Sequence, residues 1–300
     1  MTTPPMKRIH QILLAVTMGM MAPLTIAPMA QAIDFDSTSL PVYSELTIDG
    51  ITAKVTKGIN LNDDPNGSLG AFSDFYYNED VVSIDFNDPS ARKAVDGKNN
   101  AYTFGDESVM FSFDKGLGAN RTDVFSHQTW GPSGANGERN TSDYLGVFNG
   151  NEVTIDLADN LNYFGINWGA LSANNTFEFF QVDAAGDETS LGLFNYDSLF
   201  TNANGSTDSS KLPTLASHQN QYNGYVHFYA NETTGLFNRI KVSQVSTNGG
   251  GFETDNYSFH FSEQSFDFDE GTDTAQTPEP GAMLGLVFLG GMVMRRRLAV

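Results

Sequence analysis

The chain has 300 residues, no cysteine, and 36 acidic against 16 basic side chains, which gives a formal net charge of −20 at pH 7. The lack of cysteine excludes a disulfide framework and a thiol nucleophile, so a folded body must be held by an apolar core or by bound ions. The negative charge disfavours nucleic acid and anionic membrane surfaces as partners. The 23 Phe, 11 Tyr and 29 Gly residues are typical of aromatic-rich strands joined by turns.

The first 32 residues have the layout of a secretory signal peptide. Lys7 and Arg8 form a positive region, residues 12–26 are mostly apolar, and Ala30 and Ala32 complete an A-x-A cleavage site. A second possible site ends at Ala30. The alternative is a first transmembrane helix, but the apolar stretch is short for one. We therefore predict export through the Sec translocon and cleavage by signal peptidase after Ala32.

Between residues 33 and 262 the sequence alternates short strand-like runs with turn-forming residues. Asp49-Gly50 and Asn149-Gly150 are two-residue turns that each predict a hairpin, and Gly186-Asp187 predicts a further turn. The expected strands cover residues 43–48, 51–55, 81–86, 101–104, 109–113, 144–148, 152–157, 164–168, 176–182, 188–194, 224–230, 237–245 and 256–261. The expected loops cover residues 87–100, 131–142 and 201–220.

This pattern, with no convincing amphipathic helix, predicts an all-β fold. We expect an antiparallel β-sandwich, jelly-roll-like, flanked by an N-terminal signal helix and a C-terminal hydrophobic helix. No fixed repeat period is visible, which disfavours propellers and solenoids. The expected parts are a signal peptide at 1–32, a sandwich domain at 33–262, an acidic polar linker at 263–277 and a C-terminal tail at 278–300.

The last expected strand of the domain follows a run of three glycines. In an uninterrupted strand, Glu253, Asp255 and Tyr257 share one face with Phe259 and Phe261. The aromatic residues mark the core side, so Asp255 is expected at the edge of the core. A buried carboxylate needs hydrogen bonds or a cation.

Calcium is a candidate for that cation. The ion takes several oxygen ligands, and a polar loop could supply Asp63 and Asp64 beside Asp255 if the first and last strands are neighbours. The alternative is ordinary turn chemistry, because Asp-Asp-Pro-Asn-Gly favours turns and the loop lacks the spacing of an EF-hand.

Aromatic side chains that stay exposed are platforms for sugar rings. The two tryptophans, Trp130 and Trp168, each precede a glycine, and Tyr222 and Tyr225 lie beside a long expected loop. Packing in a core is the commoner role of such residues. Carbohydrate binding therefore stays open as one interpretation of these four residues.

Signals for catalysis are weak. His127, His218, His227 and His260 show no metal-binding spacing, and no Gly-x-Ser-x-Gly elbow is present. A glycosidase needs two facing acids, which the sequence alone does not select, and Glu178 on an expected strand is interpreted as solvent-facing. We therefore expect a non-catalytic protein, and the alternative is a secreted glycan-active hydrolase on a jelly-roll scaffold.

The end of the chain combines a polar proline motif, an apolar segment at residues 281–294 and a basic cluster, in that order. As a helix, the apolar segment would reach about 21 Å, short of the roughly 30 Å hydrocarbon core. The basic cluster would lie with the cytoplasmic headgroups, which places the rest of the chain outside. The motif is Pro278, Glu279 and Pro280, and the cluster is Arg295, Arg296 and Arg297.

This arrangement resembles the PEP-CTERM sorting tail. The resemblance implies a protein that crosses the inner membrane of a Gram-negative-type bacterium, is held there by its tail, and is processed by an exosortase near residues 278–280. An ordinary C-terminal anchor or a buried hydrophobic helix is the alternative. We therefore expect an exported cell-surface or extracellular-matrix protein that associates with exopolysaccharide or acts in adhesion. No cofactor other than calcium is expected.

Overall fold

The computed structural model describes residues 41–126, 130–218, 220–247 and 250–274. By its internal contacts the chain divides into residues 1–34 and residues 35–300, and all of the described elements belong to the second unit. The expected signal peptide, with Ala30 and Ala32, and the expected sorting tail lie outside the described residues. Among the residues that are described, no helix is both long enough and apolar enough to cross a membrane.

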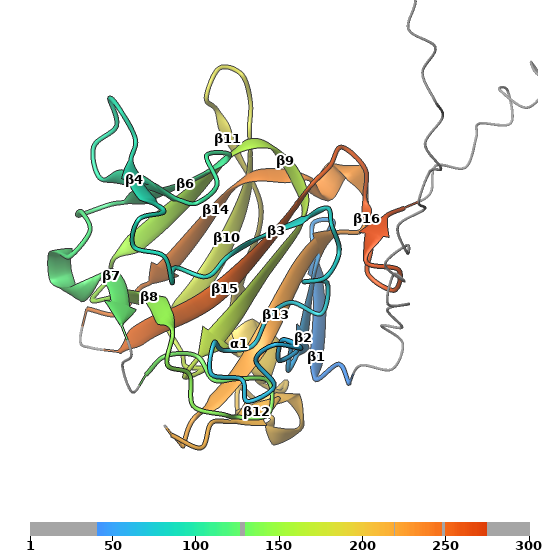
Figure 1. The fold of residues 1–300 in the computed structure, drawn as a ribbon. Coiled ribbons are helices and arrows are strands. Elements are labelled where there is room, and N and C mark those ends of the chain that lie inside the picture. The colour runs from blue at the N-terminus through green and yellow to red at the C-terminus, as the bar shows by residue number, and fades with distance from the viewer. Residues whose placement is uncertain (1–40, 127–129, 219, 248–249, 275–300) are drawn as a thin grey trace, which may run out of the picture. The chain divides into compact units, whose positions relative to one another are not determined.

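The described part of the chain is almost entirely β-structure, as the sequence predicts (Figure 1). Every pairing between its strands is antiparallel. Strands β1 to β15 join into one hydrogen-bonded sheet, and β16 and β17 form a separate hairpin.

The bounds of the strands are β1 (Ser44–Ile48), β2 (Ile51–Thr56), β3 (Val81–Ile84), β4 (Arg92–Ala94), β5 (Ala101–Phe104), β6 (Val109–Phe113), β7 (Asp123–Ser126), β8 (Asp143–Phe148), β9 (Glu152–Gly169), β10 (Asn175–Val182), β11 (Glu188–Asn195), β12 (Thr214–Leu215), β13 (Tyr222–Ala230), β14 (Phe237–Gln244), β15 (Gly251–Phe261), β16 (Phe266–Asp267) and β17 (Thr272–Asp273). The short helical elements are α1 (Tyr196–Phe200) and the 3-10 turns η2 (Ala119–Arg121), η3 (Ser209–Lys211) and η4 (Thr233–Gly235). Strands β4 and β12 therefore lie inside two stretches that were expected to be loops.

Strand β9 organises the sheet, because its 18 residues pair with different strands along its length. Its first half lies between β6 and β14, and its second half lies between β13 and β15. The main path through the sheet runs β1-β2-β13-β9-β14-β10-β11. The two ends of this path approach each other, since Ile48 of β1 lies close to Gly192 of β11, but β1 and β11 do not pair.

The two predicted hairpin turns have different outcomes. Asp49 and Gly50 have φ values of 45° and 87°, as a two-residue turn of this type requires, and β1 pairs with β2 in the predicted hairpin. Asn149 and Gly150 also have positive φ values, but β8 does not pair with β9, so the second hairpin prediction is wrong. Both edges of β9 near this turn are already occupied, because Val153 lies opposite residues of β6 and β14. Strand β8 pairs with β7 and β15 instead.

The predicted linker also differs from the structure over its described part. Residues 263–274 are predicted to form a polar linker, but they contain the β16–β17 hairpin (Figure 1). Phe266 and Phe268 of this hairpin are buried, with 2% and 5% exposure. Phe266 stacks on Tyr163 of β9 at a centroid distance of 4.8 Å. The aromatic side chains attach this segment to the sheet, so the folded domain extends to residue 274 at least.

Strand β15 is interrupted by a bulge that reverses which residues face the core. Asn256 has a φ of 48°, and the pairing with β9 shifts register between Asp255 and Ser258. Tyr257 and Phe259 lie in the apolar core, whereas the Asp255 carboxylate points to the opposite face, where Asn140 donates to it. The prediction that Asp255 and Tyr257 share one face is therefore wrong, because it assumed an uninterrupted strand.

The second half of β9, with β13 and β15, is buried on both faces. One face carries the apolar core, which includes Trp168, Phe228 and Tyr257. The opposite face is covered by residues 69–75, 133–142 and 266–268, and we call it the polar layer. Its members on the three strands are Tyr163, Asn167, Tyr225, His227, Asp255, Ser258 and His260, all of which are buried.

Candidate functional site

A cleft opens beside the start of β15 and has a volume of about 300 Å³. This volume is at the lower end of the range for small-ligand sites. It is lined by residues of η2, β8 and β15 and by residues of the loops that follow β9 and precede β13 and β15, together with Trp130. They are Arg121, Trp130, Phe148, Ala170, Ser172, Gln221, Gly250, Gly251 and Glu253.

The two tryptophans occupy opposite environments. Trp168 is 0% exposed and packs in the apolar core against Phe177 and Phe252, so it offers no platform to a ligand. Trp130 is 45% exposed and lines the cleft. Of the two tryptophans proposed from the sequence, only Trp130 is therefore placed to contact a ligand.

Glu253 is the buried acid of the cleft. It is 5% exposed, and in the described part of the chain no other residue donates a hydrogen bond to its carboxyl group. Gly251 leaves room for this carboxyl group, because a Cβ there would collide with Glu253 Oε1 and with the Phe148 ring. Burial raises the pKa of Glu253 to about 7, against the opposing effects of its own backbone N–H and of the Arg121 charge.

Arg121 supplies a cation on the wall of the cleft. It is the last residue of η2, whose N-cap is Gly118, and it has a φ of 67°. Its guanidinium carbon lies 4.9 Å from the centre of the Phe148 ring. This is the geometry of a cation–π contact. Arg121 and Glu253 do not form an ion pair, so both groups remain available to a ligand.

Two neutral polar groups complete the lining. Ser172 Oγ accepts a hydrogen bond from Asn175 at 3.1 Å, which leaves its O–H free to donate. The Gln221 amide lies at the cleft and has no hydrogen-bond partner among the described residues. The cleft thus combines an aromatic ring, a cation, an acid, an amide and a hydroxyl group, which suits a polar ligand with an apolar face.

The polar layer is the second place where titratable groups gather. His227 Nε2 lies 2.9 Å from Asp74 Oδ2, and His227 Nδ1 lies 2.8 Å from Tyr163 OH. A proton on Nε2 suits both contacts, because the ring then donates to Asp74 and accepts from Tyr163. Thr56 Oγ1 donates to the same Asp74 oxygen at 2.7 Å, and Ser73 Oγ lies 2.7 Å from Tyr163 OH.

This network resembles a catalytic arrangement of hydroxyl, imidazole and carboxylate, but it is closed to solvent. His227 is 0% exposed and Asp74 is 3% exposed. The rings of Phe75 and Phe268 lie edge-on to the imidazole, at centroid distances of 5.8 and 5.2 Å. The network therefore contributes to the stability of the fold, and the open cleft is the better candidate for a functional site.

The residues proposed as calcium ligands are not brought together. Asp64 accepts hydrogen bonds from Ser68 Oγ and from the Leu69 backbone within its own loop, and Asp63 is exposed. Asp255 accepts from side chains of the 133–142 segment and is 0% exposed. Among the described residues, no group of three or more acidic or histidine side chains is arranged to hold a metal ion.

The Asp255 carboxyl group is stabilised instead by neutral donors. Asn140 Nδ2 and Ser142 Oγ donate to Oδ2 at 3.0 and 2.9 Å, and the Asn256 backbone donates to Oδ1 at 2.8 Å. Burial raises the pKa of Asp255 well above its usual range, and these hydrogen bonds oppose the shift. Asn256 also donates to the backbone carbonyl of Leu69, so the loop that follows Asp64 does reach β15.

The other candidates from the sequence lie apart from the cleft. Tyr225 is buried in the polar layer, while Tyr222 is 37% exposed at the start of β13. Glu178 accepts a hydrogen bond from Ser190 on the neighbouring strand β11.

The described histidines also lie apart from the cleft. His218 Nε2 lies 3.2 Å from the Gly131 carbonyl oxygen, and His260 is buried, with its Nδ1 close to Asn162. His127, the proline motif at 278–280 and the arginines at 295–297 lie outside the described residues.

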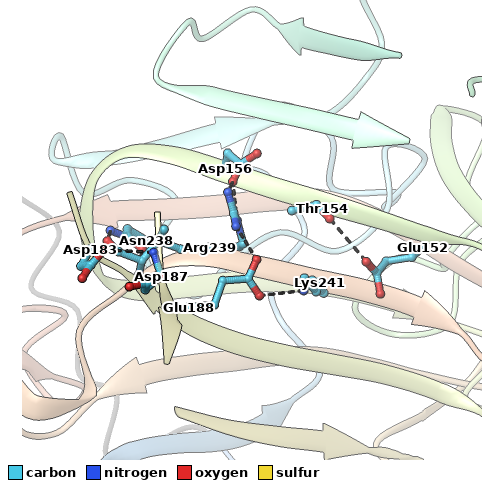
Figure 2. A network of polar contacts seen from close by, with 10 residues as sticks. Glu152, Thr154, Asp156, Asp183, Asp187, Glu188, Asn238, Arg239 and Lys241 are labelled. Atoms are coloured by element: carbon cyan, nitrogen blue, oxygen red, sulfur yellow. Dashed lines mark hydrogen bonds and ion pairs between the residues drawn. The ribbon is translucent and has the colours of Figure 1, made fainter. Parts of the chain in front are cut away.

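A cluster of charged side chains on the sheet outside the cleft is internally paired. Arg239 of β14 contacts Asp156 of β9 and Glu188 of β11, and Lys241 lies 3.0 Å from the same Glu188 (Figure 2). Hydrogen bonds from Lys241 and Arg239 lower the pKa of Glu188. These side chains are half-buried, and their ion pairs leave the two cations without free charge for a ligand.

No protein-family model matches the sequence, and the search of curated proteins found no match either. Two lining residues, Arg121 and Glu253, were not singled out from the sequence as ligand-binding. The glycine run before Glu253 was the available signal, because Gly251 is what makes room for the carboxyl group.

Proposed function

We propose that this protein is an exported cell-surface or extracellular-matrix protein whose β domain binds a glycan in the cleft. The observation that carries the proposal is that the exposed ring of Trp130 lines one cleft with Glu253, whose carboxyl group accepts no hydrogen bond from another described residue. Sugar rings present an apolar C–H face to an aromatic side chain and hydroxyl groups to carboxyl, amide and hydroxyl partners. Gln221 and Ser172 supply the remaining polar groups.

The proposed architecture is a β-sandwich of the jelly-roll type. The support is the exchange of partners along β9, which belongs to one set of strands with β6 and β14 and to another with β13 and β15. The apolar core between these two sets draws residues from both. Long loops at the ends of such strands are common positions for ligand sites.

The proposed route to the surface depends on the two chain ends. The leader would pass the Sec translocon and lose residues 1–32 to signal peptidase. Residues 281–294 would hold the chain transiently in the inner membrane, and an exosortase would cut near Pro278, Glu279 and Pro280. Replacing the arginines at 295–297 with glutamine should impair retention and processing, which an immunoblot of membrane and medium fractions measures. Unchanged processing would contradict this route.

The direct test of the glycan proposal is a glycan array on the mature protein, run with and without calcium. Trp130→Ala should weaken binding by at least about tenfold, or about 1.4 kcal/mol. Tyr77→Ala is the matched control, because Tyr77 is 47% exposed and lies outside the cleft. Equal affinities of the two variants for a bound glycan would remove the cleft from the proposal. A requirement for calcium would indicate an ion held elsewhere or by the ligand, because Asp63, Asp64 and Asp255 do not converge.

A glycan hydrolase is the second candidate, and the pKa of Glu253 favours it. A carboxyl group with a pKa of about 7 can act as a general acid or base at neutral pH. Hydrolysis by the common two-acid routes needs a second carboxylate facing the first, and Glu253 is the one acid among the described residues that line the cleft. Release of reducing sugar by the wild type, but not by Glu253→Gln, would favour the hydrolase over the binding role.

A further inference from the structure

We infer that the glycan bound in the cleft carries free amino groups, and that Glu253 pairs with a ligand ammonium group. The ligand class is thus an unacetylated amino-sugar polymer. This inference rests on the proposed glycan-binding function and specifies the ligand of the same site.

The first reason is that the carboxyl group of Glu253 forms no ion pair with a described residue. At 5% exposure it is buried, and its charge is not balanced by an ion pair with Arg121, whose guanidinium group lies over the Phe148 ring instead. Burial of an unpaired carboxylate is unfavourable. A ligand ammonium group in the cleft would supply the missing partner and would favour the ionised form.

The second reason is the aromatic wall. Trp130 presents a tryptophan side chain, the best of the aromatic partners for a cation, and it is 45% exposed in the cleft. An amino sugar would therefore meet complementary groups on two sides, with its ring face on Trp130 and its ammonium group toward Glu253. An N-acetylated sugar offers only the first of these contacts.

The third reason is the charge of the chain. A net charge of −20 attracts polycations and repels polyanions before contact is made. A polymer of uronic acids would have to approach against this field and would contact Arg121 rather than Glu253. The two ligand classes therefore differ in which residue anchors them.

The test compares three tetrasaccharides on the mature protein by calorimetry at pH 6.5: unacetylated glucosamine, N-acetylglucosamine and galacturonic acid. We expect the wild type to prefer the unacetylated tetramer over the N-acetylated one by at least about tenfold. Glu253→Gln should abolish this preference and leave the affinity for the N-acetylated tetramer within about twofold. Glu178→Gln is the matched control, since it makes the same change from carboxyl to amide on β10, outside the cleft.

Proton release gives a second readout. In wild type, pairing with the ammonium group should ionise Glu253, so the number of protons released on binding should exceed that of Glu253→Gln when buffers of different ionisation enthalpy are compared. Thermal unfolding of each variant establishes that it is folded. This readout separates a direct pairing from a general loss of cleft structure.

The results that would contradict the amino-sugar inference differ from those that would contradict glycan binding itself. Equal wild-type affinity for the unacetylated and N-acetylated tetramers would overturn the inference and leave glycan binding intact. Tightest binding of the galacturonate, abolished by Arg121→Gln, would also overturn it and would assign the anchor to Arg121. Absence of binding to all three, together with a blank glycan array, would overturn the proposed function itself.

Discussion

The two faces of β13, β15 and the second half of β9 are both buried but are held by different forces. On the core face, Trp168 and Phe228 pack among apolar side chains. On the opposite face, Tyr163 and His227 are 0% exposed and belong to a hydrogen-bonded network. The difference shows that burial in this domain does not mean apolar packing, because covering loops exclude water from a face that would otherwise be the solvated side of the sheet.

The two faces also make different demands on sequence. Apolar packing is non-directional and tolerates changes that keep volume. A buried polar network needs a partner for each donor and acceptor, and loss of one member leaves others unsatisfied. Gly165 illustrates this constraint, because a Cβ there would come within 2.5 Å of Tyr163 OH and 2.8 Å of Tyr225 OH.

The largest expected effect is on the core face. Trp168→Ala should lower the free energy of unfolding by about 3–5 kcal/mol, because it leaves a cavity beside Phe177 and Phe252. Trp130→Ala, which changes the same residue type at 45% exposure, should alter it by no more than about 0.5 kcal/mol. Urea denaturation monitored by circular dichroism measures both. Equal losses would show that Trp130 is also part of the packing.

The next expected loss of stability comes from a change in the polar layer. Asp74→Ala should destabilise the fold by about 1–3 kcal/mol, because it removes the shared acceptor of His227 Nε2 and Thr56 Oγ1. These two atoms lie 3.0 Å apart, so one donor can bond to the other group and one donor is left unpaired.

Asp74→Asn is the matched control, because both donors use Oδ2 and Oδ1 has no partner in the described structure. An amide oxygen in the place of Oδ2 would keep both hydrogen bonds, so this variant should lose less stability than Asp74→Ala. If the two variants lose the same amount in urea denaturation, the charge of Asp74, rather than its hydrogen bonds, stabilises the layer.

A further stability effect lies at the cleft and depends on pH. The pKa of Glu253 rises from its usual 4.5 to about 7 in the folded protein, so the folded state holds this proton more tightly than the unfolded chain does. Stability should therefore fall as the pH rises from about 4.5 to 7 and should level off above that, by up to about 3 kcal/mol from this group.

Glu253→Gln removes this ionisation. The variant should match the wild type near pH 4 and should be the more stable protein above pH 7, as measured by urea denaturation across that range. A constant difference between the two proteins at all pH values would mean that Glu253 does not titrate in this window.

Much of the strand content could be predicted from the sequence, because alternation and turn residues are local signals. The Asp49-Gly50 hairpin is an example, and its pairing is confirmed. The Asn149-Gly150 turn forms as well, but its strands separate because β6 and β14 occupy both edges of β9, and strand competition of this kind is not encoded locally. The bulge at Asn256 has the same character, since one residue reverses the faces of the strand beyond it.

The candidate site was harder to predict than the fold. Trp130 and Trp168 each precede a glycine, yet one lines a cleft and the other is 0% exposed. The exposure of each depends on segments distant in the sequence, such as β10 and β15 around Trp168. The burial of Glu253 likewise depends on β8 and β9, which flank it on both sides.

The packing of the β16–β17 hairpin against the sheet limits the length of chain between the folded domain and the proline motif at residues 278–280. Thr274 is still bonded to Ser265 within the folded domain, at 2.9 Å between backbone N and O. The four residue steps from Thr274 to Pro278 can span at most about 14 Å when fully extended. An enzyme that cut at residues 278–280 would therefore work against the surface of a folded body, and the shape of that body would set which approach directions remain open to it.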